Sequence, residues 1–120
     1  HHGTDIVAPG GTPVLAAAAG TVERLFHSER GGITLYERAP DRRWTFYYAH
    51  LRGYAPGLHE GQRVLAGQLL GFVGDTGDAE GGAPHLHFSL THTDSGQQWY
   101  QGDDINAYPY LHTGAALPAS

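Results

Sequence analysis

Cysteine, methionine and lysine are all absent from this chain of 120 residues. Without cysteine, the protein can form neither disulfide bonds nor thiolate metal sites. A chain that begins with histidine and contains no methionine is expected to be a mature or trimmed fragment. No apolar run approaches the roughly 20 residues of a membrane span, so we expect no transmembrane segment. A basic excess is absent too: the formal net charge is −5, which argues against nucleic acid as a partner.

Glycine and histidine are abundant instead, with 18 and 9 copies. A chain of this length can bury one core, so we expect a single domain. Frequent glycines between short runs of valine, isoleucine, leucine, tyrosine and threonine favour tight turns and strands. The predicted fold class is therefore all-β. We expect a small antiparallel β-sheet or sandwich whose long loops wall an open groove.

Residues 84–90 give the clearest local pattern, because apolar and polar side chains alternate strictly there. A period of two predicts a half-buried β-strand, with the two histidines, His85 and His87, side by side on one face. Leu86, Phe88 and Leu90 would then face the core. Two neighbouring imidazoles can bind a metal, move a proton, or do one each. A plain pair of surface histidines is the alternative reading.

A third histidine, His50, lies near the end of the strand predicted over residues 43–51. Together with the alternating segment 33–38 and the Ala-Pro-Asp turn between them, this strand predicts a β-hairpin. Phe46, Tyr48 and His50 are spaced two apart, so they are expected to share one face of it. We also expect the hairpin and the strand at residues 84–90 to lie in one antiparallel sheet, which would bring His50 to the other two histidines.

The chain starts with His1, His2, Gly3, Thr4 and Asp5. Histidine and aspartate are good zinc ligands, and Gly3 permits the bend that would bring His1 and Asp5 together. The spacing alone would equally allow His2 as the ligand. A remnant of a purification tag is a further explanation for two adjacent histidines.

Four motifs in this order resemble those of the lysostaphin/LytM-type zinc metalloendopeptidases. The first is His-x-Gly-x-Asp at residues 1–5, followed by Ala-Pro at residues 8–9. The second is Tyr-x-His-Leu at residues 48–51, and the third is Gly-x-x-Val-x-x-Gly-Gln at residues 61–68. The last is Pro-His-Leu-His-Phe at residues 84–88. The glycine- and aspartate-rich loop at residues 77–83 and Ser89 depart from the family pattern, which affects expectations about substrate preference more than about chemistry.

The resemblance implies that His1, Asp5 and His87 bind Zn²⁺ and that His50 and His85 are the catalytic pair. It is the family pattern that selects His1 rather than His2. Three protein ligands leave a position for water, as in catalytic zinc sites. One histidine would then act as general base and the other would stabilise the oxyanion, in an order that the sequence leaves open.

The resemblance further implies a zinc-dependent endopeptidase that hydrolyses peptide cross-links of bacterial peptidoglycan. A non-catalytic relative that binds cell wall or activates an amidase is the alternative, but all five site residues are present here. A lipoyl- or biotinyl-type carrier domain is excluded, because it requires a modified lysine. We expect a LytM-type metallopeptidase domain over residues 1–112 and a C-terminal tail over residues 113–120. The protein is expected to be an exported monomer that acts on stem peptides or cross-bridges.

Overall fold

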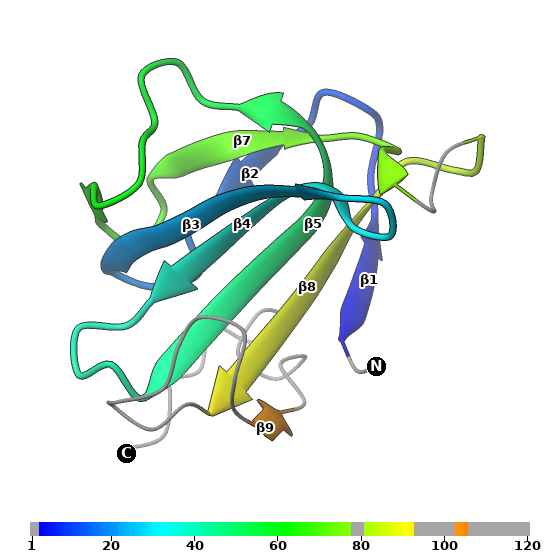
Figure 1. Ribbon diagram of the computed structural model, residues 1–120. Helices are drawn as coiled ribbons and strands as arrows, with labels where there is room; N and C mark the ends of the chain where they lie inside the picture. Colours follow the sequence, from blue (N-terminus) through cyan, green and yellow to red (C-terminus); the bar gives the residue numbers. More distant parts are fainter. Residues whose placement is uncertain (1–2, 78–80, 93–102, 106–120) are drawn as a thin grey trace.

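The computed structural model describes residues 3–77, 81–92 and 103–105. Within these residues every regular element is a strand, and every strand pair is antiparallel (Figure 1). The strands are β1 Thr4–Val7, β2 Pro13–Leu15, β3 Gly20–Ser28, β4 Gly32–Arg38, β5 Trp44–Tyr54, β6 Arg63–Val64, β7 Leu69–Val73, β8 His85–His92 and β9 Asp103–Ile105. The all-β prediction is confirmed.

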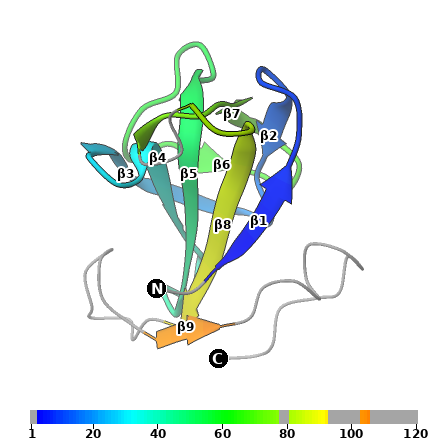
Figure 2. The same cartoon turned by 90° about the vertical axis from the view of Figure 1, so that its right-hand side faces the viewer.

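The main path of the sheet runs in the order β1-β8-β5-β4-β3-β6. β7 pairs with β5 and also with β2, and β9 pairs with β8. Figures 1 and 2 show β2 and β7 lying together across one end of the longer strands. The predicted hairpin is β4 with β5, and β8 pairs with β5 on its other side, so hairpin and histidine strand share one antiparallel sheet as expected.

The core follows from the alternation in these strands. Phe88 and Leu90 on β8 are buried and pack with side chains of β4 and β5, while Leu86 packs against them in part. Phe88 contacts both Phe46 and Tyr48, with ring centroids 6.3 and 5.0 Å apart. The face of β8 that carries Leu86, Phe88 and Leu90 is therefore its core face, as the period of two predicts. The opposite face carries the histidines.

The C-terminal part is described only at β9, whose backbone pairs with residues 90–92 of β8. The predicted tail over residues 113–120 lies outside the described residues, as does His1. Among the described residues there is no helix of the length and apolar character needed to cross a membrane.

Candidate active site

The two histidines of β8 lie beside the aspartate of β1. In the antiparallel pairing of these strands Asp5 is directly opposite His87, and Val7 is opposite His85. Directly opposed residues place their side chains on the same face within about 5 Å. His87 Nδ1 lies 2.7 Å from Asp5 Oδ1, and His85 Nε2 lies 3.9 Å from the same oxygen. Residues 82 positions apart in sequence thus form one cluster through strand pairing.

Gly3 leaves the space that the His87 ring occupies. A Cβ atom at this position would lie 2.6 Å from His87 Nε2 and 2.9 Å from the carbonyl oxygen of Phe88. Real Cβ atoms do not approach other atoms so closely. The glycine of the first motif is therefore required for close contact between the start of β1 and the ring of His87, in addition to any bend it permits.

His50 reaches the cluster by a route that the sequence did not predict. Its ring centroid lies 4.9 Å from that of His85 and 6.1 Å from that of His87. Phe46 and Tyr48 instead pack on Phe88 in the core. The expectation that Phe46, Tyr48 and His50 share one face is therefore wrong.

A β-bulge explains this difference. Between the pairs Leu35–Tyr48 and Ile33–Leu51, β5 contains one residue more than β4. His50 has φ of 62°, in the left-handed region where glycine is usual. The extra residue reverses the alternation, so Leu51 returns to the core while His50 turns toward the other histidines. A non-glycine residue in this conformation is strained, and such strain gathers at functional sites.

Carbonyl oxygens fix the ring orientation of two histidines. His50 Nδ1 lies 2.7 Å from the Thr76 oxygen, and His85 Nδ1 lies 3.1 Å from the Ala83 oxygen. A carbonyl oxygen only accepts hydrogen bonds, so both Nδ1 atoms carry the proton. In the neutral form of each ring, Nε2 is then the basic nitrogen. Both rings are prepared to accept a proton at Nε2, and to donate from it once protonated.

Thr76 is a supporting residue that sequence reasoning missed. Its hydroxyl donates to the Leu51 oxygen at 2.7 Å and accepts from the Ile33 amide at 3.1 Å. These bonds join the loop after β7 to β4 and β5, and so place the Thr76 carbonyl on His50. The sequence around residues 74–77 gives no local signal that the carbonyl of this threonine contacts a histidine.

Tyr47 is a second neighbour of the cluster. Its ring meets that of His87 edge-on with centroids 6.1 Å apart, and it packs on Tyr36 at 4.7 Å. Burial, followed by the electrostatic effect and hydrogen bond of Tyr47, raises the pKa of Tyr36 well above its ordinary value. The Tyr36 hydroxyl therefore stays neutral throughout the physiological range. We assign Tyr47 to packing beside His87 and Tyr36 to packing on Tyr47.

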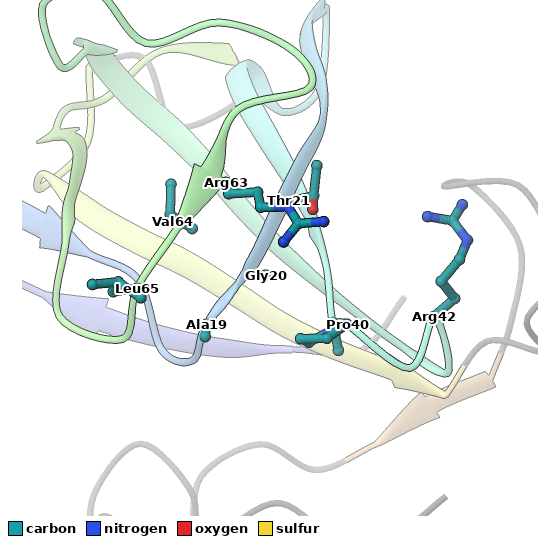
Figure 3. Close-up of a pocket in the computed structure, with 9 residues that line it drawn as sticks. Ala19, Gly20, Thr21, Pro40, Arg42, Arg63, Val64 and Leu65 are labelled. Carbon is teal, nitrogen blue, oxygen red and sulfur yellow. The ribbon is translucent and has the colours of Figure 1, made fainter.

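A cavity of about 410 Å³ lies elsewhere, between β3, β6 and the turn that joins β4 to β5 (Figure 3). Its lining residues are Ala19, Gly20, Thr21, Ala39, Pro40, Arg42, Arg63, Val64 and Leu65. None of these described residues is a carboxylate or an imidazole, so this cavity has no counterpart of the histidine cluster. The cluster of Asp5 with the three histidines lies instead on the face of β1, β5 and β8.

Two of the three predicted metal ligands, Asp5 and His87, are therefore adjacent, whereas His1 lies outside the described residues. Within the described part of the chain no group of three histidine, aspartate or glutamate side chains has the arrangement of a metal site. A carboxylate oxygen and an imidazole nitrogen at this separation fit zinc as a donor pair, which a third ligand would complete.

The sequence profile of peptidase family M23 matches residues 1–106, which include every predicted site residue. The chain belongs to peptidase family M23. This confirms the resemblance to the lysostaphin/LytM-type enzymes. Among solved M23 structures, the catalytic domain of lysostaphin from Staphylococcus simulans superimposes with a TM-score of 0.76 at 31% identity, covering 92% of this chain and 78% of that one.

Curated relatives agree with this M23 membership. The L-Ala--D-Glu endopeptidase of Bacillus subtilis is 34% identical over 116 residues, covering 92% of this chain and 34% of that protein. The peptidoglycan DD-endopeptidase ShyC of Vibrio cholerae is 41% identical over 90 residues, covering 75% of this chain and 20% of that protein. The chain thus spans about a third or less of the length of these relatives.

Proposed function

We propose that this chain is a zinc-dependent endopeptidase that hydrolyses peptide cross-links of bacterial peptidoglycan. The observation that carries the proposal is the convergence of Asp5, His50, His85 and His87 on one face of the sheet. Membership of a peptidase family supports the reaction class. The substrate class is supported by the names of two relatives, an L-Ala--D-Glu endopeptidase and a peptidoglycan DD-endopeptidase.

His1, Asp5 and His87 are the proposed zinc ligands. Asp5 and His87 face each other across the β1–β8 pairing, and His1 stands two residues before Gly3, which packs against His87. Bound zinc would act as a Lewis acid that polarises the peptide carbonyl and lowers the pKa of a water molecule. The protein supplies the rest of the chemistry through His50 and His85.

His50 and His85 are the proposed general base and oxyanion stabiliser, in either order. Each holds Nδ1–H on a carbonyl oxygen, so Nε2 of the neutral ring can take a proton from the attacking water. The same carbonyl stabilises the imidazolium that results, since it accepts from a charged donor. A protonated ring can donate from Nε2 to the developing oxyanion. With their rings 4.9 Å apart, the two histidines can serve one scissile bond.

Residues 1–112 would form the catalytic domain, with residues 113–120 as a tail. Its substrates would be stem peptides or cross-bridges, encountered outside the cytoplasm, and it would work as a monomer. The non-catalytic alternative, a domain that binds wall or activates an amidase, predicts neither bound zinc nor hydrolysis.

Mass analysis of muropeptides tests the proposal. Purified peptidoglycan is incubated with the zinc-loaded protein, and the soluble products are compared with those of an untreated sample. We expect cross-linked species to fall and their peptide fragments to appear, with no new reducing sugar ends, because no pair of carboxylates lies beside the histidines in the described site. Unchanged cross-linked muropeptides, or cleavage of glycan, would refute the proposed reaction.

A further inference from the structure

Arg52 follows the catalytic segment of β5, and its guanidinium lies on two consecutive glycines. A Cβ atom on Gly10 would come within 2.7 Å of Arg52 Nη2, and one on Gly11 within 3.0 Å of Nη1. Any side chain at Gly10 would therefore displace the guanidinium. Both glycines lie in the loop between β1 and β2. A hydrogen bond from the Gly11 amide to the Val73 oxygen holds this loop to β7.

This guanidinium stands at the edge of the proposed active site. A Cβ atom on Gly10 would lie 3.8 Å from Cγ of Pro84, the residue that precedes His85, as well as 2.7 Å from Arg52 Nη2. The Ala8 amide also bonds to the Pro84 oxygen at 3.4 Å. Along the β1–β8 pairing, the Asp5–His87 pair is followed by Val7–His85 and then by the loop whose Gly10 and Gly11 contact the guanidinium of Arg52. Arg52 is thus placed just beyond His85.

The charge of Arg52 is exposed and, among the described residues, has neither an ion-pair nor a hydrogen-bond partner. Arg24 and Arg42, by contrast, lie 3.8 and 3.3 Å from the carboxylates of Glu60 and Glu23. A planar guanidinium fixed against a backbone presents a fork of N–H donors, which matches a carboxylate in two parallel hydrogen bonds.

We propose that Arg52 is a specificity-determining residue that binds a free carboxylate of the substrate, next to the scissile peptide bond. The preferred substrate class is then an acidic cross-linked peptide rather than an uncharged glycine bridge. This inference rests on the proposed endopeptidase function, and it assigns Arg52 to substrate positioning and not to bond cleavage. Gly10 takes part as the surface that keeps the guanidinium in place.

A matched pair of substrates tests this assignment. One is a cross-linked stem-peptide dimer with its free α-carboxylates, and the other is the same dimer with these groups converted to carboxamides. We expect the wild-type protein to favour the carboxylate dimer in kcat/KM by about 10- to 100-fold, the usual worth of a charge-assisted hydrogen-bond pair. Arg52→Gln should remove that preference, so that the two dimers are cleaved with similar kcat/KM, while Arg52→Lys should restore part of it.

Two glycine variants separate positioning from folding. Gly10→Ala should displace the guanidinium and reduce the carboxylate preference, because the new Cβ needs the space of Nη2. Gly53→Ala is the matched control, since a Cβ there meets nothing within 4 Å, and it should keep the wild-type preference.

The outcomes distinguish this inference from the function on which it rests. If the wild-type protein cleaves neither dimer, the proposed function fails. If it cleaves both dimers equally well, or if Arg52→Gln keeps the carboxylate preference, the role of Arg52 is refuted while the endopeptidase function stands.

Discussion

At the scale of single residues, the candidate site depends on contacts that orient its three imidazole rings, and on a left-handed backbone conformation at one of them. His50 occupies a left-handed conformation and bonds through Nδ1 to the Thr76 oxygen. His85 is held by the Ala83 oxygen, and His87 by Asp5. Each constraint directs an imidazole to the same place. The strain at His50 is stored in the folded protein and has a measurable cost in stability.

The first prediction compares two variants of His50. Both His50→Ala and His50→Gly remove the imidazole, so both should lose activity by a factor on the order of 10²–10⁴. His50→Gly should nevertheless have the higher free energy of unfolding, by about 1 kcal/mol, because glycine adopts φ of 62° without strain and alanine does not. Urea unfolding of the two proteins provides the measurement. Equal stability would show that position 50 is unstrained.

At the scale of elements, three strands and one loop assemble the site. β1 contributes Asp5, β8 contributes His85 and His87, and β5 contributes His50 through its bulge. The loop after β7 holds this bulge, because Thr76 bonds to both β4 and β5. The loop therefore acts as a clamp on the end of β5 that carries His50.

The second prediction concerns this clamp. Thr76→Val keeps the shape of the side chain but loses the hydroxyl. The Leu51 oxygen and the Ile33 amide then each lose a hydrogen-bond partner. We expect the free energy of unfolding to fall by about 1–3 kcal/mol. We also expect kcat to fall, because the carbonyl that orients His50 moves. Thr76→Ser retains the hydroxyl and should preserve most of both quantities. If Thr76→Val lost stability but kept full kcat, the loop would have no part in orienting His50.

Sequence reasoning succeeded at this scale where one strand could be read alone. Alternation over residues 84–90 indicated which side chains of β8 face the core, and this is confirmed by Phe88 and Leu90. It failed at His50, because a bulge inserts one residue without any local signal in the sequence. The sequence also did not indicate the role of Thr76, since the contact between its carbonyl oxygen and His50 joins residues 26 positions apart. The shared antiparallel sheet was expected to bring His50 near the other two histidines, and this is confirmed, but the bulge that turns its ring toward them was not predicted. The place of His1 stays a prediction.

At the scale of the whole molecule, the side chain of Glu37 lies within the core, away from the candidate site. Glu37 is fully buried and accepts a hydrogen bond from the Tyr48 hydroxyl at 3.0 Å, while that hydroxyl accepts from the Ala17 amide. Burial raises the pKa of Glu37 from 4.5 to about 8, although the Tyr48 bond lowers it in part. Glu37 is therefore mainly protonated in the folded protein at neutral pH.

The third prediction follows from the sign of this shift. Below about pH 4.5 Glu37 is protonated in both states, and its contribution to stability is fully present. As the pH rises toward 8, the unfolded chain ionises first, so the free energy of unfolding falls. Glu37→Gln cannot ionise and should escape this loss.

Urea unfolding of both proteins at pH 5 and pH 8 checks this prediction. The advantage of Glu37→Gln over the wild type should grow between these values by an amount on the order of 2–4 kcal/mol. Both proteins contain the same nine histidines, so any histidine contribution cancels in the difference between their free energies of unfolding. A constant difference would mean that Glu37 titrates normally in the folded state.

The most direct test of the account is the zinc content of the histidine variants, measured by plasma mass spectrometry together with turnover of cross-linked muropeptide. The chain should be extended upstream of His1, because a free terminal amine there could itself bind metal. We expect His87→Ala and His1→Ala to lose both zinc and activity, since three protein ligands become two. His50→Ala and His85→Ala should keep zinc near one equivalent and lose only activity, while His2→Ala should change little. Zinc retained by His87→Ala, zinc lost from His85→Ala, or full activity in His50→Ala would contradict the assignment.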